Sequence, residues 1–256
     1  MPFSAVTLIP LRGIKLVEQG DDLGAIAINA FEANGLAPEA GDVLVVAQKI
    51  VSKAEGRYLD VMSATPSERA VALAAELGKD ARFVEVVLSE SKRVVRHRPG
   101  LLIVEHRLGF VMANAGIDHS NVASEDESER VLLLPRDPDG SARALHDHLA
   151  HFFETPIAVI ISDSFGRPWR KGTVGVALGV AGLPALIDMR GRPDLFGRPL
   201  QVTETGFADE IAAAAGLLMG QADEAVPIVL VRGLNWSAPE LPAAALIRPA
   251  EHDLFR

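Results

Sequence analysis

Short β-branched runs that alternate with helix-like stretches limit this chain to a fold in which strands and helices are interleaved. The run at 42–47, Asp-Val-Leu-Val-Val-Ala, has the length and branching of a buried strand. Further strands are predicted at 6–11, 101–105, 131–134, 157–161 and 228–231, and helices at 23–34, 66–77, 141–153 and 208–219. This order predicts an α/β or α+β class, although it is too irregular for a simple series of strand–helix–strand units.

Capping and turn residues mark several of the expected boundaries. Asp21 or Asp22 can cap the helix that starts at Leu23, and Thr65 followed by Pro66 marks the start of another helix. The segment 124–128 consists of Ser and acidic residues, and 136–140 combines charge with Pro and Gly; both are expected to be the most solvated loops. The 256 residues can form one large domain or two closely joined ones.

Charge and cysteine content exclude several functional classes. Lys and Arg total 25 against 34 Asp and Glu, which gives a net charge of −9 and argues against a nucleic-acid-binding surface. The absence of cysteine excludes disulfides, thiolate nucleophiles and cysteine metal sites. The N-terminal residues do not resemble a signal peptide, and no apolar window is long enough to span a bilayer. We therefore expect a cytoplasmic protein with no membrane partner.

Two aspartates carry the strongest chemical signal. Asp118 lies in Ala-Gly-Ile-Asp-His-Ser-Asn and Asp163 in Ile-Ser-Asp-Ser-Phe-Gly, so each follows an apolar run and precedes hydroxyl or amide side chains. Both were expected in glycine-containing loops at strand ends, where an aspartate can also simply cap a turn. Because Mg²⁺ and Mn²⁺ prefer carboxylate, hydroxyl and water oxygens, the shared pattern favours a divalent metal site that includes Ser164.

A cluster of cations follows the second aspartate. Arg167, Arg170 and Lys171 lie close together around Trp169 and between glycines. They can form an ordinary solvated face, but arginine's bidentate geometry favours the binding of a phosphate or another anion. No Walker A sequence is present, so a nucleotide would have to be bound in another way, and the absence of G-x-S-x-G argues against a serine hydrolase.

Two further residues have both a functional and an ordinary interpretation. Lys53 follows the strand at 42–47 with Gln48 and Ser52 nearby, and the pattern alone favours a functional lysine no more than an exposed lysine on an edge strand. His119, beside Asp118, is more typical of a hydrogen-bonding loop residue than of a metal ligand or base.

Taken together, these segments resemble the coenzyme F420-0:L-glutamate ligase family, from about Leu11 to Leu234. The matching stretches lie at 20–23, 49–57, 115–121, 162–170, 202–204, 209–215 and 231–234. The resemblance implies an F420 ligase-like fold of mixed sheets with flanking helices, in an intertwined homodimer. It also implies one ligase domain over residues 1–256, without the C-terminal nitroreductase-like domain of many bacterial relatives.

The resemblance implies a full set of site residues. Asp118 and Asp163 would be the catalytic residues and ligands of one Mg²⁺ or Mn²⁺, and Ser164 and Gln221 would hold a second. K⁺ is a further candidate cation. GTP would contact a set drawn from four segments: Ile14, Lys15, Leu16, Val17, Gln48, Lys53, Asn121, Met219, Gly220, Gln221, Ala222, Asp223, Glu224, Ala225 and Val226. Ser164 replaces the threonine of many relatives and keeps its oxygen, whereas Gln48 replaces a serine found in some bacterial relatives.

The implied reaction joins L-glutamate to the carboxylate of coenzyme F420-0 through an acyl phosphate, releasing GDP and phosphate, and further γ-linked glutamates can follow. No protein nucleophile is needed, which agrees with the absence of cysteine. Clustering alone motivates the hypothesis that Arg167, Arg170 or Lys171 holds the substrate's phosphodiester. The alternatives are a phosphohydrolase, a carboxylate–amine ligase for another acid, and a non-enzymatic GTP-binding protein.

Overall fold

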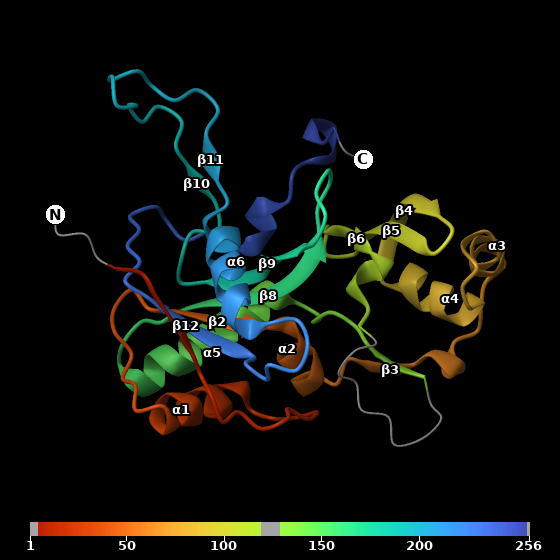
Figure 1. Cartoon of the computed structure of the whole chain (residues 1–256), viewed down its shortest axis with the longest axis horizontal. Helices are drawn as coiled ribbons and strands as arrows, with labels where there is room; N and C mark the ends of the chain where they lie inside the picture. The colour runs from red at the N-terminus through yellow and green to blue at the C-terminus, as the bar shows by residue number, and fades with distance from the viewer. Residues whose placement is uncertain (1–4, 119–128, 255–256) are drawn as a thin grey trace.

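A five-stranded sheet forms the centre of the computed structural model, which describes residues 5–118 and 129–254 (Figure 1). The strand order is β1-β12-β2-β8-β9, and the strands span Thr7–Pro10, Ile228–Arg232, Val43–Ala47, Ala158–Gly166 and Thr173–Ala181 respectively. β2 and β8 run parallel, whereas the other neighbouring pairs are antiparallel. The carboxyl ends of β2 and β8 therefore lie side by side, with Ala47 opposite Ser162.

Helices cover both faces of this sheet. One face packs against α1 (Leu23–Ala33), α2 (Gln48–Ala54) and α5 (Pro138–Phe153), and Phe31 is fully buried in that layer. The other face packs against α6 (Phe207–Met219). The helix lies so close to β9 that a Cβ at Gly175 would approach the Ala212 carbonyl oxygen to 2.5 Å. Glycine at 175 therefore permits the contact between α6 and the sheet.

A smaller lobe is inserted between β2 and β8. It contains α3 (Glu68–Leu77), α4 (Ala81–Ser89) and the sheet β4-β5-β6 (Ser91–Arg98, Leu101–His106 and Val111–Ala113). The two helices share a separate apolar core with β4 and β5. The two-stranded sheet of β3 (Tyr58–Asp60) and β7 (Arg130–Leu132) connects this lobe to the body. Short 3-10 helices lie at Val61–Ser63, Asn114–Gly116, Ala243–Leu246 and Ala250–His252.

A hairpin arm projects from the body. Its paired base consists of β10 (Ile187–Asp188) and β11 (Glu204–Thr205), and Figure 1 shows it extending away from the central sheet.

The carboxylate of Glu90 joins the small lobe to the body. It accepts hydrogen bonds from Arg57 at 2.9 Å and Arg107 at 3.0 Å, and buried His106 lies 3.4 Å away. These neighbours lower the pKa of Glu90 to about 2, even though burial alone would raise it. Arg57 also donates to the Leu134 carbonyl oxygen, so the cluster ties the lobe to the chain that leads into α5.

The structure confirms the mixed α and β composition and most of the expected elements, with three differences. Residues 48–54 form α2, so Lys53 lies on a helix and not on an edge strand. Ser67, rather than Thr65, caps α3, because its side chain accepts from the Ala70 N–H. The segment 136–140 is not merely a solvated loop, since Asp137 caps α5 and Pro138 begins it with its side chain buried.

Two further expectations concern a solvated loop and the absence of a membrane-spanning segment. The expected solvated loop at 124–128 lies outside the described residues. None of the described helices has the length and apolar character needed to cross a bilayer.

Asp139 provides a test of how the layers are held together. Its carboxylate accepts from the Val180 and Ala243 N–H groups at 2.8 Å each and from Ala244 at 3.3 Å. Asp139→Ala leaves these backbone donors without their partner and should lower the free energy of unfolding by roughly 2–4 kcal/mol. Urea denaturation measures the change. Asp147→Asn, on the exposed side of α5, is the control, and equal stability of the two variants would contradict this role.

Candidate functional site

A cavity of about 620 Å³ opens at the carboxyl ends of the parallel strands β2 and β8. This is the edge of an open sheet at which α/β proteins generally bind ligands. Its walls come from the segment after β1, the start of α2, the second half of β8, and the connection from α6 to β12. They include Ile14, Lys15, Leu16, Val17, Gln48, Lys49, Ile50, Lys53, Ser162, Asp163, Ser164, Met219, Gly220, Gln221, Ala222, Asp223, Ala225, Val226 and Pro227.

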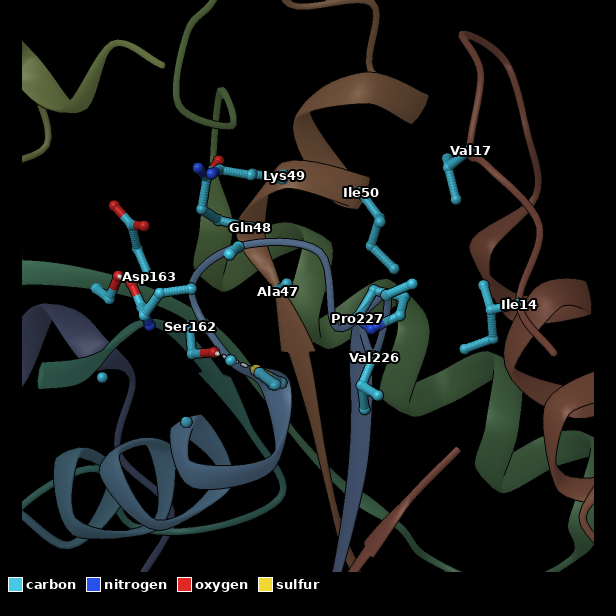
Figure 2. A pocket seen from close by; sticks show the side chains of 18 of the residues that line it. Ile14, Val17, Ala47, Gln48, Lys49, Ile50, Ser162, Asp163, Val226 and Pro227 are labelled. Atoms are coloured by element: carbon cyan, nitrogen blue, oxygen red, sulfur yellow. Dashed lines mark hydrogen bonds between the residues drawn. The ribbon is translucent and has the colours of Figure 1, made fainter. Parts of the chain in front are cut away.

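The cavity has a polar end and an apolar end. Figure 2 shows Gln48, Lys49, Ser162 and Asp163 grouped on one side, and Ile14, Val17, Ile50, Val226 and Pro227 on the other. A ligand that fits both ends must carry charged or polar groups at one end and a flat or apolar group at the other.

Asp163 lies within β8, where its backbone pairs with Val176 of β9, and not in a loop after the strand as the sequence suggested. Burial and the nearby charge of Asp118 raise the pKa of Asp163 to about 7, against smaller lowering effects from the Ser164 N–H and from Lys49. The site thus holds two carboxylates that repel each other. A bound cation would relieve that repulsion.

Asp118 reaches the site from the small lobe. It follows a turn in which Asn114 and Ala115 have φ of 49° and 54°, a left-handed conformation that costs non-glycine residues about 1 kcal/mol or more each. The Asp118 backbone exchanges two 2.9 Å hydrogen bonds with Leu132, which fixes its position against β7. The sequence predicted a loop directly after an apolar run, whereas Asp118 follows the 3-10 helix at Asn114–Gly116 and pairs with Leu132 in an isolated antiparallel bridge.

Two residues at the start of α2 contact the Asp118 carboxylate. The Gln48 amide donates to Oδ2 at 2.9 Å, and Lys49 Nζ lies 3.4 Å from Oδ1. Gln48 and Asp118 are 70 residues apart in sequence, so this contact joins the body to the small lobe.

Ser164 and Gln221 are in direct contact. The Ser164 hydroxyl donates to the Gln221 side-chain oxygen at 2.7 Å, across 57 residues of sequence. Gln221 lies in the connection that follows α6, and in the same connection Glu224 accepts from the Ala222 N–H at 2.8 Å. Glu224 is the one expected nucleotide contact among the described residues that does not line the cavity.

Lys49 and Lys53 are one helical turn apart on α2 and both line the cavity. Burial, and then repulsion from Lys49, lowers the pKa of Lys53 from its ordinary value. Two cations at this spacing, of which Lys49 lies 3.4 Å from the Asp118 carboxylate, can hold a phosphate group.

The structure therefore brings together most of the residues singled out from sequence. Asn121 and His119 lie outside the described residues. Lys49, Ile50 and Ser162 also line the cavity but were not expected there. For Lys49 a signal was available, because it precedes Lys53 by four residues and a helix places such residues on one face.

The donor set suits a hard divalent cation. Asp118, Asp163, Ser164 and Gln221 offer carboxylate, hydroxyl and amide oxygens, which Mg²⁺ and Mn²⁺ prefer. No group of three or more His, Cys, Asp or Glu side chains able to hold a metal occurs within 5–118 and 129–254.

The cations of the β8–β9 hairpin lie at its turn. Arg167 donates to the Gly172 carbonyl oxygen at 3.1 Å and so helps to close the turn. Trp169 has φ of 65° and its side chain is 88% exposed, so the turn presents an aromatic ring and positive charges to the solvent.

Comparison with known proteins gives a consistent result. A sequence model described as F420-0:gamma-glutamyl ligase matches residues 13–233. A Methanothermobacter thermautotrophicus protein named coenzyme F420:L-glutamate ligase is 45% identical over 253 residues, which cover 98% of this chain and 99% of its own length. Proteins of the same name are 42% identical in Methanocaldococcus jannaschii (91% of this chain, 92% of that protein) and 44% in Archaeoglobus fulgidus (98% and 96%).

The raised pKa of Asp163 predicts a pH-dependent stability. A carboxyl whose pKa rises from 3.8 to about 7 on folding binds its proton more tightly in the native state, so its contribution to stability falls as the pH rises through that window. Asp163→Asn removes this loss of stability at higher pH, because the amide does not ionise. Without metal, the variant should match the wild type near pH 4 and exceed its free energy of unfolding by up to about 4 kcal/mol at pH 8.

Urea denaturation at several pH values in EDTA measures this difference. Asp147→Asn serves as the exposed control and should show no such trend. Adding Mn²⁺ at pH 8 should stabilise the wild type and not Asp163→Asn. A stability difference that stays constant between pH 4 and pH 8 would contradict the electrostatic origin.

Proposed function

The chain belongs to the F420-0:gamma-glutamyl ligase family, and we propose that it joins L-glutamate to a carboxylate of coenzyme F420-0 with GTP as the energy source. Membership makes the protein an enzyme that ligates a carboxylate to glutamate. The proposal adds the nucleotide, the intermediate and the residues that act on them.

The observation that carries the proposal is the cavity with one polar and one apolar end. A nucleoside triphosphate has the same division, since its base is flat and its phosphates are strongly charged. Lys49 and Lys53 supply positive charge for phosphate oxygens, and Ile14, Val17 and Val226 supply an apolar surface for a base. This fit supports a nucleotide, and the choice of GTP rests on the family resemblance.

The proposed reaction has two steps. An oxygen of the acceptor carboxylate attacks the γ-phosphorus of GTP, the bond to the β-phosphate oxygen breaks, and GDP leaves with that electron pair. The amine of glutamate then attacks the carbonyl of the acyl phosphate, phosphate leaves, and the amine nitrogen loses a proton as the amide forms. Each step needs positioning and charge stabilisation rather than a protein nucleophile.

The chain's own residues supply that positioning. Lys49 and Lys53 would orient the phosphates, and the apolar wall would hold the base so that the γ-phosphate lies near Asp118 and Asp163. Mg²⁺ or Mn²⁺ bound by Asp118, Asp163, Ser164 and Gln221 would offset the negative charge of the transferring phosphoryl group. We further propose that the site holds two such ions, with K⁺ as an additional cation. The enzyme would act as a homodimer and could add further γ-linked glutamates.

The test of this function is product formation from defined substrates. With F420-0, L-glutamate, GTP and Mn²⁺, mass spectrometry should detect an acceptor enlarged by glutamyl units, and GDP should appear in equal amount to the amide bonds formed. Asp163→Asn should reduce turnover by 100-fold or more because the site loses a charged ligand. Asp147→Asn, remote from the cavity, should retain the wild-type rate.

The intermediate can be tested in the same assay. An acceptor labelled with ¹⁸O in its carboxylate should pass one label to the released phosphate, since its oxygen bridges carbon and phosphorus in the acyl phosphate. Amide formation with unlabelled phosphate would contradict that intermediate. GTP hydrolysis without any amide product would indicate that the protein is a phosphohydrolase or a ligase for a different acid substrate.

The β8–β9 turn yields a separate prediction about the acceptor. If Arg170 and Lys171 hold its phosphodiester, Arg170→Glu and Lys171→Glu should each raise the KM for F420-0 about tenfold and leave the KM for GTP unchanged. Arg167 also closes the turn, so its replacement tests folding as well. Arg69→Glu, which reverses an exposed charge on α3, is the matched control. An unchanged KM for F420-0 in all variants would contradict phosphodiester binding by the turn.

A further inference from the structure

We infer that Ser52 is a positioning residue that acts through Gln48 to orient the Asp118 carboxylate for metal binding. The inference rests on the proposed function, because it assigns a role in the same site. Ser52 lies on α2, is 0% exposed and belongs to no expected ligand set.

A continuous chain of hydrogen bonds joins the three residues. The Ser52 hydroxyl donates to the Gln48 side-chain oxygen at 2.9 Å, and the Gln48 side-chain nitrogen donates to Asp118 Oδ2 at 2.9 Å. Ser52 and Gln48 are one turn apart on α2 and both are buried. A buried serine in a helix commonly bonds to the backbone carbonyl four residues earlier, whereas here its hydroxyl meets the side chain of that residue.

The chemistry of the groups fixes the direction of this chain. An ionised carboxylate only accepts hydrogen bonds, so Gln48 must present its NH₂ group to Asp118. The amide oxygen then points the other way, towards a partner that must donate. The Ser52 hydroxyl is that donor and holds the amide oxygen in place. The Asp118 carboxylate itself opposes the flipped amide, which would place an oxygen against it.

The chain distinguishes the two oxygens of Asp118. Oδ2 is engaged by Gln48, while Oδ1 lies 3.4 Å from Lys49 Nζ, a cation that also lines the cavity. Asp118 comes from the small lobe and α2 from the body, so the Gln48 amide also sets the carboxylate's position relative to Asp163. Gln48 therefore acts on the proposed metal site through Asp118.

Loss of a group that orients a metal ligand generally weakens metal binding 10- to 100-fold. Ser52→Ala should therefore weaken Mn²⁺ binding to the metal-binding site by about tenfold or more, measured by the electron paramagnetic resonance signal of free Mn²⁺. Ser52→Thr keeps the hydroxyl and should bind Mn²⁺ within about threefold of the wild type. Urea denaturation of each variant checks that the comparison is made between folded proteins.

A double-mutant cycle tests whether Ser52 acts through Gln48. Gln48→Met keeps the length of the side chain and removes both hydrogen bonds, so it should weaken Mn²⁺ binding by itself. Adding Ser52→Ala to Gln48→Met should then cause no further loss, because the effects of residues in one network are not additive. Full additivity of the two losses would overturn the proposed route.

The outcomes separate this inference from the proposed function. A wild type that binds Mn²⁺ while folded Ser52→Ala binds it equally well would overturn the positioning role and leave the metal site standing. Equal losses in Ser52→Thr and Ser52→Ala would also overturn it, since packing and not the hydroxyl would then matter. A wild type that binds no Mn²⁺ would contradict the proposed metal site itself.

Discussion

The parallel pairing of β2 with β8 is the constraint on which the site depends. It places Ala47 opposite Ser162, so the chain leaves β2 into Gln48 and Lys49 at the same level at which β8 reaches Asp163. Neighbouring parallel strands need a long crossover, and here that crossover contains the small lobe. The same connection that satisfies the sheet therefore also brings Asp118 into contact with Gln48 and Lys49, which line the cavity.

Charge at this edge is arranged for ligand binding at some expense of stability. Asp118 and Asp163 are close enough for one to raise the pKa of the other, and the left-handed turn before Asp118 adds backbone strain. Lys49 offsets part of the negative charge, and Lys53 adds a second positive charge one helical turn along α2. A carboxyl with a perturbed pKa in a cavity, as at Asp163, is typical of functional sites, which supports a cation and phosphate at this edge.

Local patterns in the sequence predicted the two aspartates and the strands β1, β2, β5, β7, β8 and β12, but not β9 of the central sheet or the contacts between distant segments. Apolar, β-branched runs are sufficient to find β2 and the first half of β8. The polar second half of β8 is a strand because β9 pairs with it, which periodicity does not reveal. The Ser164–Gln221 contact spans 57 residues and was expected only from the family resemblance. The role of Ser52 depends on a series of side-chain hydrogen bonds that no spacing rule predicts.

The most direct test of a combined metal and nucleotide site is a crystal structure with Mn²⁺ and a non-hydrolysable GTP analogue. Anomalous scattering should locate manganese bound to Asp118 and Asp163, with phosphate oxygens completing its shell and Lys49 and Lys53 near the phosphates. The base should lie against Ile14, Val17 and Val226. Manganese at another position, or a nucleotide outside the cavity, would contradict the account of this site.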